Sequence, residues 1–286
     1  MLSEYRDIEV VLPAQPVSDG AGVRLKRSIG TEALDHLDPF LLLDEFKSES
    51  ASDYIRGFPN HPHRGFETVT YMIAGSFEHR DHLGNHGILE PGSVQWMTAG
   101  RGIVHSEMPR QEDGLLWGFQ LWVNLPASDK LCAPRYQDIA AAAIPVVNRE
   151  DGTVVRVIAG RYGRVTGPVT KILTDPLYLD VTVPAGKAVE LPVARGHSAF
   201  AYVFDGAGEL GGSHKRQGMP VGSGLLTSFA DGDRVQAVAS PSGLRFLLVA
   251  AQPLGEPIAR FGPFVMNTRE EVIAAYEQYR AGTFLA

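Results

Sequence analysis

Two pairs of side chains in this sequence have the types and spacing of metal ligands. His61 and His63 flank a proline, and His105 and Glu107 are likewise two residues apart. Alternate residues of a strand point to the same side, and a residue before proline favours the extended conformation. Adjacent strands of a barrel could therefore join three imidazoles and a carboxylate, a set that suits Fe(II), Mn(II), Ni(II), Cu(II) or Zn(II). A structural zinc site would more often use cysteine.

Glu67 is a second carboxylate that could complete such a site. It has the same parity as His61 and His63, so the spacing alone does not choose between Glu67 and Glu107 as the fourth ligand. Glu67 could instead accept a hydrogen bond from the far ring nitrogen of a ligand histidine. A third interpretation is an ion pair between Glu67 and Arg64.

Glycine and proline punctuation predicts the strands that must position these side chains. The 31 glycines and 19 prolines separate short runs rich in Val, Ile, Thr, Tyr and Phe, which is typical of a sandwich or barrel. TYMIAG at 70–75 and AYVFDG at 201–206 indicate a repeated β unit. We therefore predict an all-β protein with two antiparallel barrel domains, residues 1–130 and 131–286. The stretch NTREEVIAAYEQYRAG, with a capping box at Thr268, predicts a short C-terminal helix.

The remaining histidines do not predict a second metal site. His79, His82 and His86 fall in FEHRDHLGNHGIL, whose LGNHG segment is typical of a hairpin loop. We interpret these three histidines as solvated. In the register of the internal repeat, Pro192 and Ala194 stand where the first domain has its His-Pro-His element. The second domain is therefore expected to lack the ligand set.

Composition and charge argue against several classes of function. A net charge of -7 and a pI of about 5.7 do not favour nucleic-acid binding, which depends on clustered positive charge. A single cysteine, Cys132, allows no internal disulfide. The charged N-terminal segment lacks the apolar run of a signal peptide, and the longest apolar run is too short to span a bilayer. We expect a cytoplasmic, non-membrane protein and, because two barrels cover their own sheet faces, a monomer.

Several longer segments resemble the pirin family of bicupins. DPFLLLDEF, GFPNHPHRGFETVTYMIAG, PGSVQWMTAGRGIVHSEMP, GFQLWVNLP and GPFVMNTREE carry the resemblance, which extends from about residue 22 to 286. It implies two jelly-roll barrels, with one metal ion in the N-terminal barrel and a degenerate C-terminal barrel. The ligands that it implies come from the HPH and H-x-E elements, here His61, His63, His105 and Glu107. The metal of the family is usually iron, and Glu67 is then not a direct ligand.

The resemblance also implies an activity similar to that of quercetin 2,3-dioxygenase, in which O2 opens the ring of a flavonol. The flavonol hydroxyl must lose a proton on binding the metal, and Glu107 is the candidate acceptor, with Glu67 as the second choice. A flat aromatic substrate requires apolar walls. The candidates are Phe58, Phe66, Trp96 and Met97, although each could equally belong to the barrel core.

A non-catalytic function is the alternative hypothesis. Some pirins act as iron-dependent regulators that bind other proteins, and the partner here would be a transcription factor or a metabolic enzyme. Membership of a fold family does not determine which function a site performs. The metal-dependent dioxygenase is our primary hypothesis, and the regulator is the rival.

Overall fold

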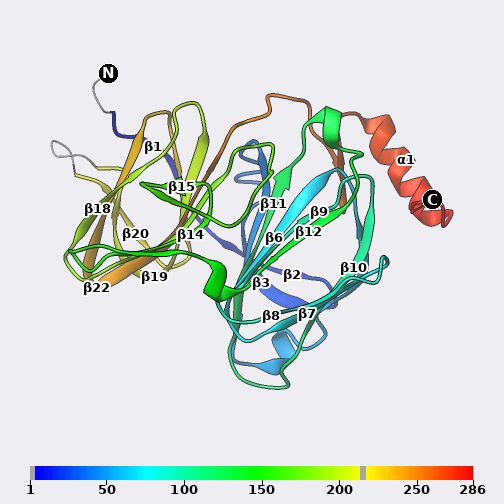
Figure 1. Ribbon diagram of the computed structural model, residues 1–286, viewed down its shortest axis with the longest axis horizontal. Helices are drawn as coiled ribbons and strands as arrows, with labels where there is room; N and C mark the ends of the chain where they lie inside the picture. The colour runs from blue at the N-terminus through cyan, green and yellow to red at the C-terminus, as the bar shows by residue number, and fades with distance from the viewer. Residues whose placement is uncertain (1–3, 213–216, 286) are drawn as a thin grey trace. The chain divides into compact units, whose positions relative to one another are not determined.

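The computed structural model describes residues 4–212 and 217–285, which form two compact units built from antiparallel sheets (Figure 1). Unit 1 comprises Met1–Ala14 and Ala143–Pro253, and unit 2 comprises Gln15–Ala142 and Leu254–Ala286. The prediction of an all-β protein with a short C-terminal helix is confirmed.

The two units are not consecutive halves of the chain. Strand β1 (Ile8–Pro13) pairs with β21 (Leu225–Phe229), so the N-terminal segment extends the sheet of unit 1. The C-terminal segment, in contrast, belongs to unit 2. The expected division into residues 1–130 and 131–286 does not follow this exchange of terminal segments. Pairing between strands so far apart in the chain leaves no local signal in the sequence.

Unit 2 contains two sheets and a hairpin. The larger sheet has the spatial order β12 (Arg135–Ile139), β9 (Val94–Thr98), β6 (Phe66–Ala74), β11 (Leu116–Asn124), β4 (Phe40–Ser48), β3 (Val23–Ile29) and β2 (Gln15–Asp19). The smaller sheet has the order β5 (Phe58–His63), β10 (Ile103–Pro109), β7 (Phe77–Asp81) and β8 (His86–Leu89). Short 3-10 turns lie at Ala51–Asp53 and Ala127–Asp129.

The inner face of the larger sheet of unit 2 carries a row of polar side chains. Cross-strand pairing aligns them in the order Gln95, Thr70, Gln120, Asp44 and Arg27. Two residues along the strands from this row lies an apolar cluster with members from both sheets of the unit. It includes Leu25, Phe46, Met72 and Phe77. Because buried polar groups require partners, the polar row marks the level of the barrel where a site can form.

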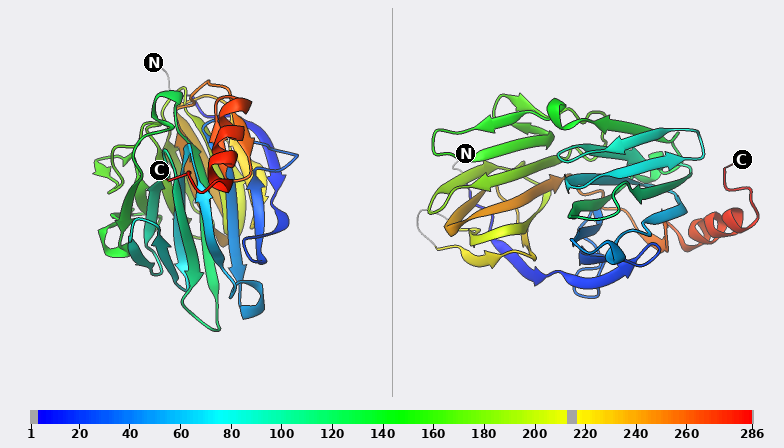
Figure 2. Two further views of the ribbon diagram at one scale, coloured as in Figure 1. Left: turned by 90° about the vertical axis from the view of Figure 1, so that its right-hand side faces the viewer. Right: turned by 90° about the horizontal axis from the view of Figure 1, so that it is seen from below.

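The C-terminal segment of unit 2 forms a hairpin and a helix. The hairpin consists of β23 (Ala259–Phe261) and β24 (Phe264–Met266), and helix α1 (Arg269–Arg280) follows it at the C-terminal end of the chain (Figure 2). Thr268 and Glu271 form the predicted capping box. Val272 and Ala275 pack against Phe264 and Met266 of the hairpin, so the helix attaches to the unit through a small apolar cluster.

Unit 1 is a single sheet with two further strands paired to its centre. The order is β1, β21, β19 (Ser198–Leu210), β22 (Arg234–Ala251), β17 (Leu177–Val183), β14 (Val154–Ala159) and β13 (Val146–Asn148). Strand β18 (Ala188–Pro192) pairs with β22, and β20 (Met219–Gly222) pairs with β19. A small pair, β15 (Arg161–Tyr162) and β16 (Val165–Thr166), and a 3-10 turn at Ala141–Ala143 complete the elements.

The interior of unit 1 is aliphatic. Its core consists almost entirely of valine, leucine, alanine and phenylalanine side chains. Leu191 and Val193 point into this core, whereas Pro192 and Ala194 are exposed. The inward positions are therefore one residue away from those that the internal repeat predicted. Neither inward side chain can bind a metal ion.

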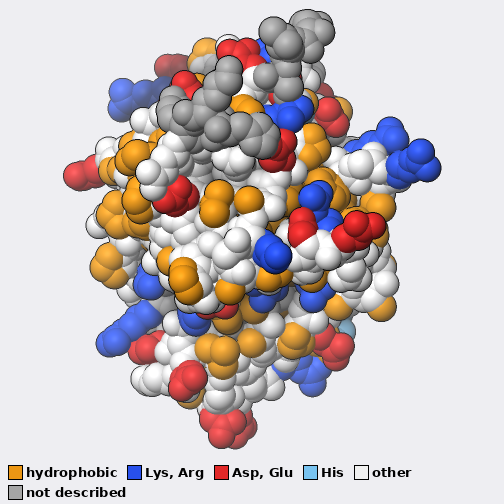
Figure 3. Space-filling model, turned by 90° about the vertical axis from the view of Figure 1, so that its left-hand side faces the viewer, with side chains coloured by type: hydrophobic (Ala, Val, Ile, Leu, Met, Phe, Trp, Pro, Cys, Tyr) orange, Lys and Arg blue, Asp and Glu red, His pale blue; other side chains and the backbone are white. Residues whose placement is uncertain are grey.

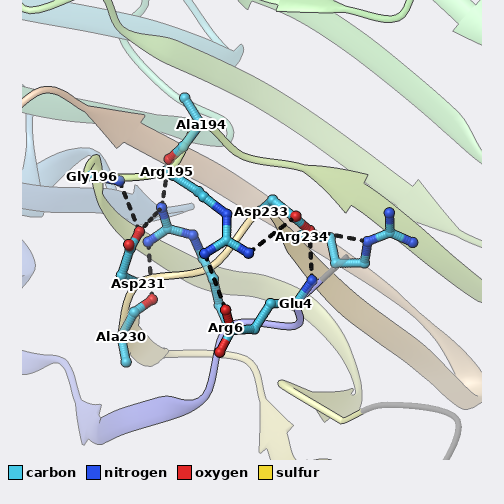
Figure 4. A network of polar contacts seen from close by, with 9 residues as sticks. All are labelled: Glu4, Arg6, Ala194, Arg195, Gly196, Ala230, Asp231, Asp233 and Arg234. Atoms are coloured by element: carbon cyan, nitrogen blue, oxygen red, sulfur yellow. Dashed lines mark hydrogen bonds and ion pairs between the residues drawn. The ribbon is translucent and has the colours of Figure 1, made fainter. Parts of the chain in front are cut away.

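A buried arginine holds the N-terminal segment to unit 1 (Figure 4). Arg6 is 1% exposed and donates hydrogen bonds to the carbonyl oxygens of Ala194, His197 and Ala230, at 2.6, 2.9 and 3.0 Å. It also lies 3.5 Å from a carboxylate oxygen of Asp231. The guanidinium thus compensates for its burial with several acceptors, as a buried charge must.

On the face drawn in Figure 3, acidic and basic side chains of the described residues are interspersed with apolar ones. Mixed charge of this kind suits a chain whose formal net charge is only -7 over 286 residues. Within the described part of the chain, no helix is both long enough and apolar enough to cross a membrane.

Candidate metal centre

The three histidines of the two spaced pairs come together on neighbouring strands of unit 2. His105 of β10 lies directly opposite His61 of β5, and His63 lies opposite Ile103. The candidate ligand atoms of His61, His63 and His105 all lie within 4.8 Å of one another. The rings of His61 and His105 have centroids 4.4 Å apart, and those of His63 and His105 are 5.0 Å apart. The positions of the three imidazoles agree with the strand alternation of His61 and His63, and their role as metal ligands stays a prediction.

Several ring nitrogens of this cluster lack a hydrogen-bond partner. Both nitrogens of His63 and Nε2 of His105 are buried without a hydrogen bond. His61 Nδ1 lies 2.8 Å from the carbonyl oxygen of Pro59. Since a carbonyl only accepts, Nδ1 donates there and Nε2 keeps its lone pair. Burial lowers the pKa of His63 and of His105 well below the ordinary histidine value, so both rings are neutral and able to bind a cation.

Glu107 lies on the same strand as His105 and is fixed by the larger sheet. Its two carboxylate oxygens accept hydrogen bonds from Thr70 Oγ1 at 3.0 Å and Gln120 Nε2 at 2.9 Å. Glu107 as a whole residue is 2% exposed. It is not among the residues whose ligand atoms lie within the 4.8 Å cluster. Its role as the fourth ligand stays a prediction, and each oxygen still has a free lone pair for a cation.

Glu67 points away from the histidine cluster. On β6, the ring of Phe66 lies 5.1 Å from that of His63, and Thr70 bonds to Glu107. Glu67 alternates with both and therefore lies on the other face, where it accepts a 2.6 Å hydrogen bond from Thr98 Oγ1. The shared parity with the histidines is lost because the chain turns at Gly65, with φ of +87°, between β5 and β6. This position does not favour Glu67 as a ligand.

His79 is a site residue that the sequence interpretation missed. It lies opposite Glu107 on β7 and is 1% exposed, so the expectation of a solvated loop histidine is wrong for this residue. Its Nδ1 is 3.3 Å from Nδ1 of His105, and its Nε2 is buried without a partner. The alternation of Phe77 and His79 in FEHRD was the available signal. His86, in contrast, is exposed as expected.

A cavity of about 530 Å³ opens beside His61 and His63. Of the predicted pocket residues, Phe58 lines this cavity. Phe66 packs behind His63 and against Trp122, with ring centroids 4.4 Å apart, and is not in the lining. Trp122 itself does line the cavity.

The other two predicted pocket residues belong to the packed interior. Trp96 pairs with Val69 and therefore shares the face of Glu67, away from the histidines. Met97 pairs with Thr68 and packs in an apolar cluster with Ala99 and Ile103. Met97 therefore fits the barrel core, whereas Trp96 is buried on the opposite face of the sheet, and neither position favours a contact with substrate.

Known proteins resemble this chain over nearly its whole length. The family profile described as Pirin matches residues 22–123, and the profile described as Pirin C-terminal cupin domain matches residues 178–285. A pirin-like protein from Caulobacter vibrioides is 46% identical over 280 residues, covering 98% of this chain and 99% of that protein. A Pseudomonas aeruginosa protein with the provisional name of a quercetin 2,3-dioxygenase is 45% identical, with 98% and 99% covered.

A solved structure shares the fold of the whole chain. The crystal structure of quercetin 2,3-dioxygenase from Acinetobacter baumannii superimposes with a TM-score of 0.88, at 32% identity, and the match covers 99% of each chain. This chain belongs to the pirin family. Its fold is the expected bicupin, with two cupin domains and a short C-terminal helix. A cupin that contains a cluster of three histidines indicates a site for a divalent metal ion.

Proposed function

We propose that this protein is a metal-dependent dioxygenase that opens the ring of a flavonol such as quercetin. In this proposal iron is the metal, and its ligands are His61, His63, His105 and Glu107. The observation behind it is the cluster of three imidazoles, in which His63 and His105 are buried and neutral and have ring nitrogens without a hydrogen-bond partner, at the edge of a cavity of about 530 Å³. That volume lies within the usual range of small-molecule sites. The relatives named as quercetin 2,3-dioxygenases add support.

The residues of the chain have separate roles at this site. When bound, the metal supplies Lewis acidity toward a substrate oxygen. Glu107 takes the proton that the substrate hydroxyl releases, which requires an ionised carboxylate at a fixed position. Thr70 and Gln120 hold that carboxylate through one hydrogen bond to each oxygen. Phe66 and Trp122 pack against the ring of His63, with centroids 5.1 and 5.3 Å away, and so help to fix its position.

The test is turnover by protein reconstituted with Fe(II) under anaerobic conditions. Quercetin and then O2 are added, and loss of flavonol absorbance is followed together with release of carbon monoxide. We expect His61→Ala and Glu107→Gln to abolish turnover, because the first removes a ligand and the second the proton acceptor. His86→Ala is the matched control, since His86 is an exposed histidine of the same unit.

Two outcomes would contradict the proposal in different ways. An absence of turnover in metal-loaded wild-type protein would refute the flavonol reaction and leave the regulator hypothesis in its place. Turnover that survives in His61→Ala would show that the reaction does not use the proposed ligands.

A further inference from the structure

The cavity beside the histidines has charged walls that the proposed reaction does not use. Asp19, Arg27, Asp44 and Arg260 all line it together with His61 and His63. A charged group that faces a small-molecule site usually fixes the orientation of the ligand. Only a charged group that is not already paired within the protein is available to a ligand.

Arg27 and the two carboxylates satisfy one another. Arg27 donates to both oxygens of Asp44, from Nε at 2.8 Å and from Nη2 at 2.7 Å, and its Nη2 also lies 2.7 Å from Asp19. The fork-like contact with Asp44 is the strong geometry for an arginine and a carboxylate. Burial nevertheless raises the pKa of Asp44 to about 6. With both carboxylates ionised this trio has no positive charge in excess, and the carboxylates also attract Arg260.

Arg260 has donors to spare. Among the described residues its only hydrogen bond runs from Nη1 to the carbonyl oxygen of Leu41, at 3.1 Å. Its guanidinium carbon lies 4.8 Å from the ring centroid of Trp122, in a cation–π contact that holds the group against the indole. Nε and Nη2 therefore remain free on a preorganised cation that is part of the cavity wall.

Trp122 connects this cation with the metal centre. Its ring contacts Arg260 at 4.8 Å and the ring of His63 at 5.3 Å. The indole itself is largely covered, because Phe66 packs against it at 4.4 Å and Trp122 is 8% exposed. A ligand that spans the cavity would therefore have the metal-binding nitrogen cluster near one end and the guanidinium near the other.

We propose that Arg260 is an anion-binding residue of this pocket, and that the preferred substrate is a flat aromatic molecule with a carboxylate in addition to its metal-binding oxygen. The inference rests on the proposed function, because it narrows the substrate class of the same site. An arginine with free donors matches a carboxylate in charge and in geometry. A neutral flavonol would offer no carboxylate to accept hydrogen bonds from Nε and Nη2 of the guanidinium.

The test compares two carboxylate ligands, each with its uncharged methyl ester. 3-Hydroxyflavone carboxylates, with the carboxyl at position 3′ or 4′, and their methyl esters are titrated into Zn(II)-loaded protein, and the dissociation constants are measured by fluorescence. We expect at least one carboxylate to bind about 10-fold or more tightly than its ester. A hydrogen bond to a charged group stabilises a complex by enough free energy to lower the dissociation constant by about that factor. Arg260→Gln should remove this preference, and Arg260→Lys should keep part of it.

The ester and a second arginine serve as controls. Ester affinity that is unchanged in Arg260→Gln shows an intact pocket. Arg24→Gln should behave like wild type, because Arg24 is an exposed arginine of the same unit that pairs with Asp53 and does not line the cavity. No preference for either carboxylate in wild-type protein would overturn the inference. An equal loss for acid and ester in Arg260→Gln would do the same.

This binding assay is independent of turnover. Arg260-dependent binding of the carboxylate without any consumption of flavonol by the Fe(II) protein would refute the proposed function and leave only the anion-binding role of Arg260 in place. Flavonol turnover without a carboxylate preference would refute the inference alone.

Discussion

The two cupin domains of this chain differ most in one cross-strand row. In unit 1 the row is Val157, Leu179, Leu248 and Ala201, all buried in an aliphatic core. In unit 2 a row across the larger sheet is Thr70, Gln120, Asp44 and Arg27. An aliphatic row needs only to fill space, whereas each member of a buried polar row needs a partner.

That difference shows how one fold can serve two purposes. In unit 2 the partners of the polar row include Glu107 of the facing sheet, bonded by Thr70 and Gln120. Hydrogen bonds therefore connect the two sheets at the level of the histidines. The sheet of unit 1 instead surrounds a continuous apolar core. Both units have the same fold, so the candidate metal site depends on the polar interior of unit 2 and not on the barrel itself.

The largest effect should follow from removing a histidine of unit 2. We expect His63→Ala to weaken Co(II) binding by more than about 100-fold, since even loss of a supporting hydrogen bond at a metal site costs about 10–100-fold. Spectroscopic titration of the metal-free protein measures this change. His197→Ala in unit 1 is the control and should bind as wild type does. Equal binding by His63→Ala and wild type would end the assignment of the metal to the polar barrel.

The next effect should come from the aliphatic core of unit 1. Leu191 is fully buried there, so Leu191→Ala should lower the free energy of unfolding by about 2–5 kcal/mol through lost burial and a residual cavity. Urea unfolding measures the loss. Co(II) affinity, which reports on unit 2, should remain that of wild type. A loss below about 1 kcal/mol would contradict the idea that unit 1 depends on packing.

A somewhat smaller effect should follow from replacing Arg6, whose guanidinium is buried in unit 1. Arg6→Met leaves the carbonyl oxygens of Ala194, His197 and Ala230 without the donor they now share. We expect a loss of about 2–4 kcal/mol in unfolding free energy, because buried acceptors without partners are costly. The control is Arg195→Gln, an exposed ion pair worth about 1 kcal/mol or less. Equal losses in the two variants would contradict this account.

The smallest effect concerns pH and the polar row of unit 2. The pKa of Asp44 is raised by burial from 3.8 to about 6. Between about pH 4 and 6 the folded protein therefore retains a proton that the unfolded chain has released, so raising the pH across this window lowers stability. The free energy of unfolding of wild type relative to Asp44→Asn should fall by about 1–3 kcal/mol from pH 4 to 6.5. A rise over the same interval would mean that the ion pair with Arg27 outweighs burial.

Much of the candidate site follows from strand alternation alone. The i, i+2 spacing of His61 with His63 placed both rings on one face, and the structure brings them to His105. The same rule, applied to Phe77 and His79, would have placed His79 inside the barrel. It failed for Glu67 because the parity count ran across a turn at Gly65. Alternation is reliable only within one unbroken strand.

Local spacing and long motifs in the sequence were sufficient to predict the family, the all-β architecture, the capping box of the helix and the shared face of His61 and His63. The residues that surround the histidine cluster could be identified only in the three-dimensional structure. Arg260 comes from a hairpin far along the chain and meets Trp122 at the cavity wall. Thr70 and Gln120 meet Glu107 across two sheets. Contacts between distant strands depend on register and packing in three dimensions, and no local pattern records them.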